Sequence, residues 1–408
     1  MMKSEIVDKR LSLYVVLYFV VLALNATLKT VLTFSDQLSS YISMFFGALL
    51  MVVMIRSIGE VMRRKGRLLS YSLILFAVLY AFSVIASGLR GEPSNAIRAI
   101  LVDSAFWTFA WWIPVGVFAA SVNDYSILYK TFLRWSFILF FILIFMVLFH
   151  RPSDKEYGFD YSMTFGNTII IPIMLHLNEY FQKKHRGLLL VALIEILLLF
   201  IYANRSVLLS VVFFVFMTIL KNTKGGAKAF YALLLVVGGG IMIVFQESII
   251  NGMISLFESF GFRSRTLVMM ANDAFFESTE RDELFAFTKG MILERPLLGW
   301  GLGGEFYHIA MGLYGYPIAS SVFSPHNGVL ENLVNFGIFG GSLATLMIVR
   351  PFFNINKNKN PYVNVLILIS GAACLPMFFS AAGFFRKPIV ALFLYLYYFS
   401  NTKRKDAQ

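Results

Sequence analysis

The sequence predicts an all-α polytopic membrane protein with about twelve transmembrane helices. It is 58% hydrophobic and only 14% charged, whereas soluble globular chains carry about 25% charged residues. Apolar runs of about 20 residues, the length needed to cross the hydrocarbon core, recur along the chain. One long polar segment, from about Gln246 to Pro325, interrupts them. These observations favour one membrane domain that carries one large loop.

Each apolar run is expected to be a helix, because the bilayer core offers no water to satisfy backbone hydrogen bonds. The first run, Leu11 to Phe34, is long and lacks a small-residue cleavage site, which indicates a permanent span rather than a signal peptide. The single cysteine, Cys374, excludes a disulfide framework. The predicted spans are 11–33, 38–55, 68–89, 99–120, 131–149, 162–181, 187–204, 206–222, 228–247, 326–349, 361–382 and 386–400.

The distribution of lysine and arginine predicts the orientation. With the N-terminus inside, most of the 35 basic residues fall in cytoplasmic loops and tails, and both termini are cytoplasmic. The chain then divides into spans one to nine (1–247), a long outward-facing loop with short helices (248–325), and spans ten to twelve with a cytoplasmic tail (326–408). The net charge of +12 is spread over short loops, which favours membrane lipids over nucleic acid as the partner.

Several kinds of site are absent from the sequence. It has no phosphate-binding loop ending in Gly-Lys-Ser/Thr, no Gly-x-Ser-x-Gly elbow, and no cluster of His, Cys, Asp and Glu with metal-ligand spacing. The glycines of Gly299 to Gly304 follow no strand, so they do not form a nucleotide fingerprint. We therefore expect a reaction without metal or other cofactor, on a substrate that is already activated, such as a lipid-linked diphosphate.

Arginines supply the candidate anion-binding residues. Arg205 lies between two apolar runs, where a charge is costly and often functional, although it would also serve as an interfacial anchor. Arg263, Arg265 and Arg281 form a second group in the polar loop, for which a solvated surface is the alternative. Arg281 precedes Leu284 to Leu298, which reads as an amphipathic helix.

His326 is the candidate general base. Ser324 resembles an N-cap and Pro325 fits the first helical position, so His326 is expected at a helix N-terminus. The helix dipole disfavours an imidazolium there, which leaves the ring able to accept a proton. Asn327, Glu331 and Asn335 follow at four-residue steps, and this polar stripe favours a site over a histidine that merely sits at the interface.

The residues resemble the O-antigen ligase and O-antigen polymerase superfamily of bacterial surface polysaccharide assembly. Three patterns carry the resemblance, together with the twelve spans and the long loop between spans nine and ten. The patterns are Arg205 followed at the fourth position by Leu209, Arg281 followed by a helix and Glu294 to Gly301, and His326 followed after ten residues by Gly337.

This resemblance implies a metal-independent glycosyltransferase of the bacterial cytoplasmic membrane, with its active site facing the periplasm or exterior. The donor would be a glycan on undecaprenyl diphosphate. Arg205 and Arg281, with Arg265 or Arg263, would hold the diphosphate, His326 would take the proton from an acceptor hydroxyl, and Asn327 and Glu331 would contact substrate.

The acceptor stays open at this point. A polymerase extends a lipid-linked repeat unit, whereas a ligase transfers the chain to lipid A-core. The sequence contexts of Tyr161 to Asn167 and of Arg205 favour the polymerase.

A transporter or flippase would explain Asp103 and Glu195, acids inside predicted spans. It would not explain the arginines and the histidine of the loop. A non-catalytic scaffold would tolerate loss of His326.

Overall fold

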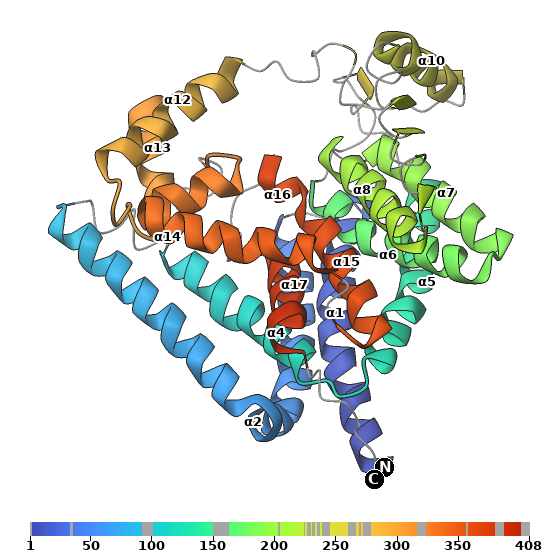
Figure 1. Ribbon diagram of the computed structural model, residues 1–408, viewed down its shortest axis with the longest axis horizontal. Coiled ribbons are helices and arrows are strands. Elements are labelled where there is room, and N and C mark those ends of the chain that lie inside the picture. Colours follow the sequence, from blue (N-terminus) through green and yellow to red (C-terminus); the bar gives the residue numbers. More distant parts are fainter. Residues whose placement is uncertain are drawn as a thin grey trace. The chain divides into compact units, whose positions relative to one another are not determined.

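The computed structural model is helical throughout its regular structure, and its described residues contain no strand (Figure 1). Among them, five helices are long and apolar enough to cross a membrane: Tyr41–Leu89, Leu101–Ala120, Tyr125–Phe145, Gly328–Phe353 and Pro361–Phe378. The protein is therefore an integral membrane protein of the all-α class. The described residues are 2–32, 36–91, 101–149, 163–202, 205–223, 225–226, 230, 233–234, 237–238, 245–259, 267–268, 271, 279–315, 324–355, 358–379 and 387–400.

Helices occupy eleven of the predicted spans, while most of the span at 228–247 lies outside the described residues. The two spans at 38–55 and 68–89 form one element that bends at Lys65, where the backbone is non-helical. The count of twelve stays a prediction. The helices at these spans are α1 (Met2–Leu32), α2 (Asp36–Leu89), η1 (Trp107–Trp112) with α4 (Ile113–Ala120), α5 (Tyr125–Phe149), α6 (Met163–Lys183), α7 (Arg186–Tyr202), α8 (Arg205–Asn222), α14 (Gly328–Phe353), α15 (Pro361–Cys374) with α16 (Pro376–Phe379), and α17 (Pro388–Phe399).

The chain forms two compact units. The first holds residues 1–15, 54–128 and 278–408, and the second holds 16–53 and 129–277. In the first unit, α17 packs against both α4 and α15. The approach of α4 to α17 is close, since a Cβ on Gly116 would lie 2.5 Å from the Tyr395 ring. Small residues at helix crossings permit such packing in membranes.

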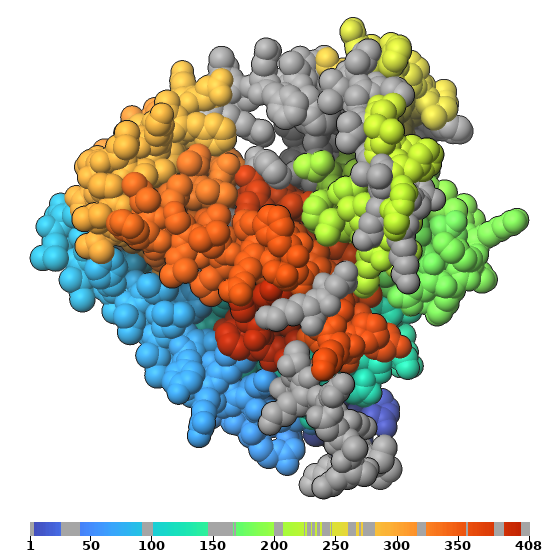
Figure 2. Space-filling view, viewed as in Figure 1, coloured from blue at the N-terminus to red at the C-terminus, as the bar shows by residue number. Residues whose placement is uncertain are grey.

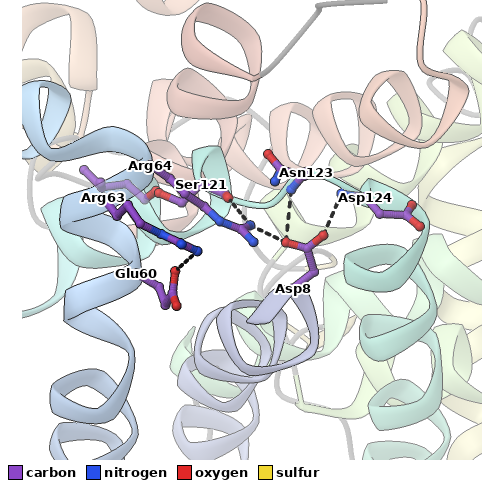
Figure 3. A network of polar contacts seen from close by, with 8 residues as sticks. Asp8, Glu60, Arg63, Arg64, Ser121, Asn123 and Asp124 are labelled. Atoms are coloured by element: carbon purple, nitrogen blue, oxygen red, sulfur yellow. Dashed lines mark hydrogen bonds and ion pairs between the residues drawn. The ribbon is translucent and has the colours of Figure 1, made fainter. Parts of the chain in front are cut away.

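A buried carboxylate joins three elements at one end of the first unit (Figure 3). Asp8 of α1 accepts hydrogen bonds from the backbone amides of Asn123, at 3.3 Å, and Asp124, at 3.1 Å. Arg64 of α2 pairs with the same carboxylate and donates to the Ser121 carbonyl, at 3.0 Å. Both charged side chains are almost enclosed, so each depends on the other for compensation.

The second unit contains a buried polar chain between α5, α6 and α7. His176 Nε2 lies 2.9 Å from Ser136 Oγ, and its Nδ1 lies 2.9 Å from Glu195 Oε2. All three side chains are buried. Glu195 of α7 is therefore held by a partner on α6. Asp103, the other acid inside a predicted span, accepts a hydrogen bond from the Trp107 indole, at 3.2 Å.

Candidate functional site

The second half of the polar loop folds onto the start of α14. Two helices of the loop, α12 (Thr279–Glu294) and α13 (Gly304–Tyr314), pack against α14 and against each other, and Figure 1 shows the three together. The sequence predicts a helix over Leu284 to Leu298, but α12 begins and ends earlier. Its end at Glu294 follows from Pro296, which disfavours helical backbone at the preceding residue. The earlier part of the loop includes α10 (Gln246–Ser259) and belongs to the second unit.

The start of α14 differs from the prediction. Asn327, not Ser324, is the N-cap, and its Oδ1 accepts hydrogen bonds from the amides of Val329, at 2.9 Å, and Leu330, at 3.1 Å. Asparagine is among the best residues for this role. His326 therefore precedes the cap instead of following Pro325 into the helix, and its backbone is left-handed, with φ +50°. The Asn327 side chain is engaged in this cap.

A glycine breaks α14 ten residues after Asn327. Gly337 has φ +70° and ψ −179°, a backbone conformation open almost only to glycine. In an unbroken helix the Ile338 amide would donate to the Val334 carbonyl. Here the two groups are separated, and each needs another partner because unpaired backbone groups are costly when buried.

The turn after α12 supplies those partners. Three hydrogen bonds between described backbone groups join it to the break in α14. The Ile338 amide donates to the Pro296 carbonyl at 2.7 Å, the Trp300 amide donates to the Val334 carbonyl at 2.7 Å, and the Gly301 amide donates to the Asn335 carbonyl at 3.0 Å. The glycine-rich segment and the segment from His326 to Gly337, which the sequence treats as separate motifs, thus form one structure. We refer to it as the loop–helix junction.

Close packing at the junction excludes side chains at two glycines. A Cβ on Gly337 would lie 2.2 Å from the Leu297 carbonyl oxygen, and one on Gly299 would lie 2.4 Å from the Val334 carbonyl oxygen. Gly299 also has a left-handed backbone, with φ +66°. The glycines are therefore required by the approach of the turn to α14.

Trp300 anchors the turn. Its indole Nε1 donates to the Met291 carbonyl of α12 at 3.0 Å, and the Arg90 guanidinium donates to its carbonyl oxygen at 3.0 Å. The guanidinium of Arg295 lies 4.4 Å from the indole centroid, and the His308 ring lies 4.0 Å from it. A cation over a tryptophan face is the most favourable form of this interaction. Trp300, whose side chain is buried, thus links α12, α13 and the residue that follows α2.

Three buried polar side chains lie behind the junction. Glu331 and Asn335 of α14 are enclosed by protein, as the predicted polar stripe implies. Glu305, in the first turn of α13, is only 1% exposed and accepts a hydrogen bond from Asn335 Nδ2 at 3.3 Å. Buried carboxylates of this kind are expensive unless paired, and functional sites often contain them.

The predicted arginines are placed only in part. Arg205 is the first residue of α8, and Arg281 lies in the first turn of α12. Their side chains, and Arg263 and Arg265 altogether, lie outside the described part of the structure. Convergence of Arg205, Arg281 and His326 on one cavity stays a prediction.

Sequence reasoning missed Glu305, Arg90 and the role of Trp300. The signal for Glu305 was available, since it is an acid at the first turn of a helix that follows a glycine run. Arg90 gave no such signal, because its contact with Trp300 is made across the fold. Among the described residues, no three His, Cys, Asp or Glu side chains gather to hold a metal ion.

Comparison with known families gives one match. Residues 188–345 match the family model described as O-antigen ligase, which confirms the resemblance to the O-antigen ligase and polymerase superfamily. The matched region runs from α7 into α14 and contains Arg205, Arg281, the whole loop–helix junction and His326. A comparison with curated proteins gave no match.

Proposed function

Taking residues 188–345 as an O-antigen ligase domain, we propose that this protein is a membrane glycosyltransferase that uses undecaprenyl-diphosphate-linked glycan as donor and a sugar hydroxyl as acceptor. The observation that carries the proposal is the loop–helix junction. It joins the two motif-bearing segments through the backbone, and so fixes the Trp300 turn beside the helix whose first turn follows His326.

The proposed reaction is a single displacement at the anomeric carbon. The acceptor oxygen forms a bond to this carbon while the bond to the diphosphate oxygen breaks. His326 takes the acceptor proton, and the electron pair leaves with undecaprenyl diphosphate. Arg205 and Arg281 stabilise the charge that develops on the leaving group, with Arg263 or Arg265 as further binding residues. No metal is required in this scheme.

Polymerisation of lipid-linked repeat units is the preferred activity. Ligation of the finished chain to lipid A-core is the second candidate, and the description of the matching family favours it. A transporter or flippase is a weaker alternative, because it would not explain the arginines and the histidine of the long loop.

The test uses His326→Ala, Arg205→Ala and Arg281→Ala in a deletion strain, followed by analysis of surface glycan length. Loss of a polymerase leaves single repeat units on the core, whereas loss of a ligase leaves bare core and lipid-linked polymer. His185→Ala and Lys289→Ala are the controls, since both side chains are exposed. Parent-like glycans in all three site variants would refute the catalytic assignment.

A further inference from the structure

The exposed surface of α12 changes character along its length. From its start as far as Lys289, its exposed side chains include the charged residues Asp282, Glu283 and Lys289. At its C-terminal end and in the following turn, Leu293, Leu297 and Leu298 are 65–68% exposed. We call these three residues the leucine ridge. Three large apolar side chains exposed within six residues are costly in water, and patches of this kind mark contact surfaces.

The leucine ridge lies at the point where α14 gains an exposed apolar face. Before Gly337, no residue of α14 is exposed. Directly after it, Ile338 is exposed and Phe339 is 74% exposed. Leu343 and Leu346 continue this face. From Ile338 to Phe353 the helix is about 24 Å long, close to the hydrocarbon thickness of about 30 Å, so we take this face as the lipid-contacting part of α14.

The loop–helix junction holds the leucine ridge beside Gly337 and Ile338, where the exposed apolar face of α14 begins. The Ile338 amide is bonded to the Pro296 carbonyl, and Leu297 touches Gly337. The ridge is therefore continuous with the lipid-contacting face, and Figure 2 shows α12 and α13 in light orange directly against α14 in darker orange. Glu294, also exposed, lies within the ridge and sets a limit on its depth, since a carboxylate is stable among headgroups but not in hydrocarbon.

We propose that the leucine ridge rests in the bilayer at the boundary between headgroups and hydrocarbon, so that the end of α12 is a membrane-bound element and not a freely solvated lid. Interfacial helices bind membranes through an apolar face of this kind, with polar residues turned to water. The occupant of the surface is lipid. The proposal does not depend on glycosyl transfer, and its test measures no activity.

The test places a fluorescent label on single cysteines in lipid nanodiscs that hold one copy of the protein. The variants are Leu298→Cys in the ridge, Lys289→Cys on the polar part of the same helix, and Phe339→Cys on α14. The native Cys374 is fully buried, and unsubstituted protein controls for its labelling. Quenching by spin-labelled lipids, with the spin label at the headgroup or at a shallow acyl position, is compared with quenching by aqueous iodide.

The expected result is strong lipid quenching and weak iodide quenching at Leu298, close to the signal of Phe339, with the reverse at Lys289. Iodide quenching at Leu298 equal to that at Lys289 would overturn the proposal. Protection of Leu298 from both quenchers would also overturn it, because protein rather than lipid would then cover the ridge. The label at Lys289 controls for partitioning of the dye itself.

Discussion

Substitution of Gly337 by alanine tests the loop–helix junction most directly. Its backbone, at φ +70° and ψ −179°, belongs to a region that costs a residue with a side chain about 1–3 kcal/mol. The new Cβ would lie 2.2 Å from the Leu297 carbonyl oxygen. Normal carbon–oxygen contacts are about 3.3 Å or longer, so the turn would have to retreat by about 1 Å.

This retreat threatens the three hydrogen bonds of the junction, each worth about 0.5–1.5 kcal/mol. Together with the backbone strain, we expect the turn to open more easily by about 2.5–7.5 kcal/mol. At 1.4 kcal/mol for each factor of ten, hydrogen exchange of the Trp300 and Gly301 amides should accelerate by about 60-fold or more.

The assay is hydrogen–deuterium exchange of peptides that cover residues 296–302, with glycan transfer measured on the same preparation. Gly290→Ala is the matched control: this glycine lies in the middle of α12 with open space around its Cβ position, so alanine there should stabilise the helix by about 0.5–1 kcal/mol. Parent-like exchange at Trp300 and Gly301 in Gly337→Ala would refute the reasoning.

Three further predictions concern the rest of the fold. Trp300→Phe removes the donor to Met291 and weakens the contact with Arg295, and should lower stability by about 1–3 kcal/mol; an unchanged melting temperature would contradict this. Asp8→Ala leaves Arg64 uncompensated and should lower the stability of the fold by about 3–5 kcal/mol. Glu60→Ala, at a more exposed ion pair, should lower it by about 1 kcal/mol or less. Equal losses of stability in thermal unfolding would contradict the role of Asp8 in joining three elements. Glu195→Ala should destabilise the second unit by about 1–3 kcal/mol, because it leaves His176 Nδ1 buried and unpaired; the check is faster exchange of α6 amides, and unchanged exchange there would count against the pair.

The sequence was sufficient for the helices at eleven of the twelve predicted spans, because hydropathy over about 20 residues is a local signal. It was also sufficient for the buried stripe at Glu331 and Asn335, which follows from helical periodicity. The sequence alone favours Ser324 as the N-cap, because a Ser-Pro pair and an asparagine are both good helix starts. Only the amide partners decide for Asn327.

Contacts between distant segments were beyond sequence reasoning. No signal in the local sequence predicts the break of α14 at Gly337, because glycine is common in membrane helices and need not break them. Asp8, between Ile6 and Lys9 near the N-terminus, reads as a solvated acid; its burial depends on Arg64 and on the amides before α5. Glu305 is similar, since the partner Asn335 lies on another helix.

The loop–helix junction has a consequence for protein engineering. Outer loops of membrane enzymes are natural segments to exchange between relatives when a new specificity is wanted. Here a cut placed at the apparent loop boundary, between Tyr314 and α14, would transplant the donors of Trp300 and Gly301 without their acceptors at Val334 and Asn335. A functional chimera should therefore inherit α12 through at least Ile338 from a single parent.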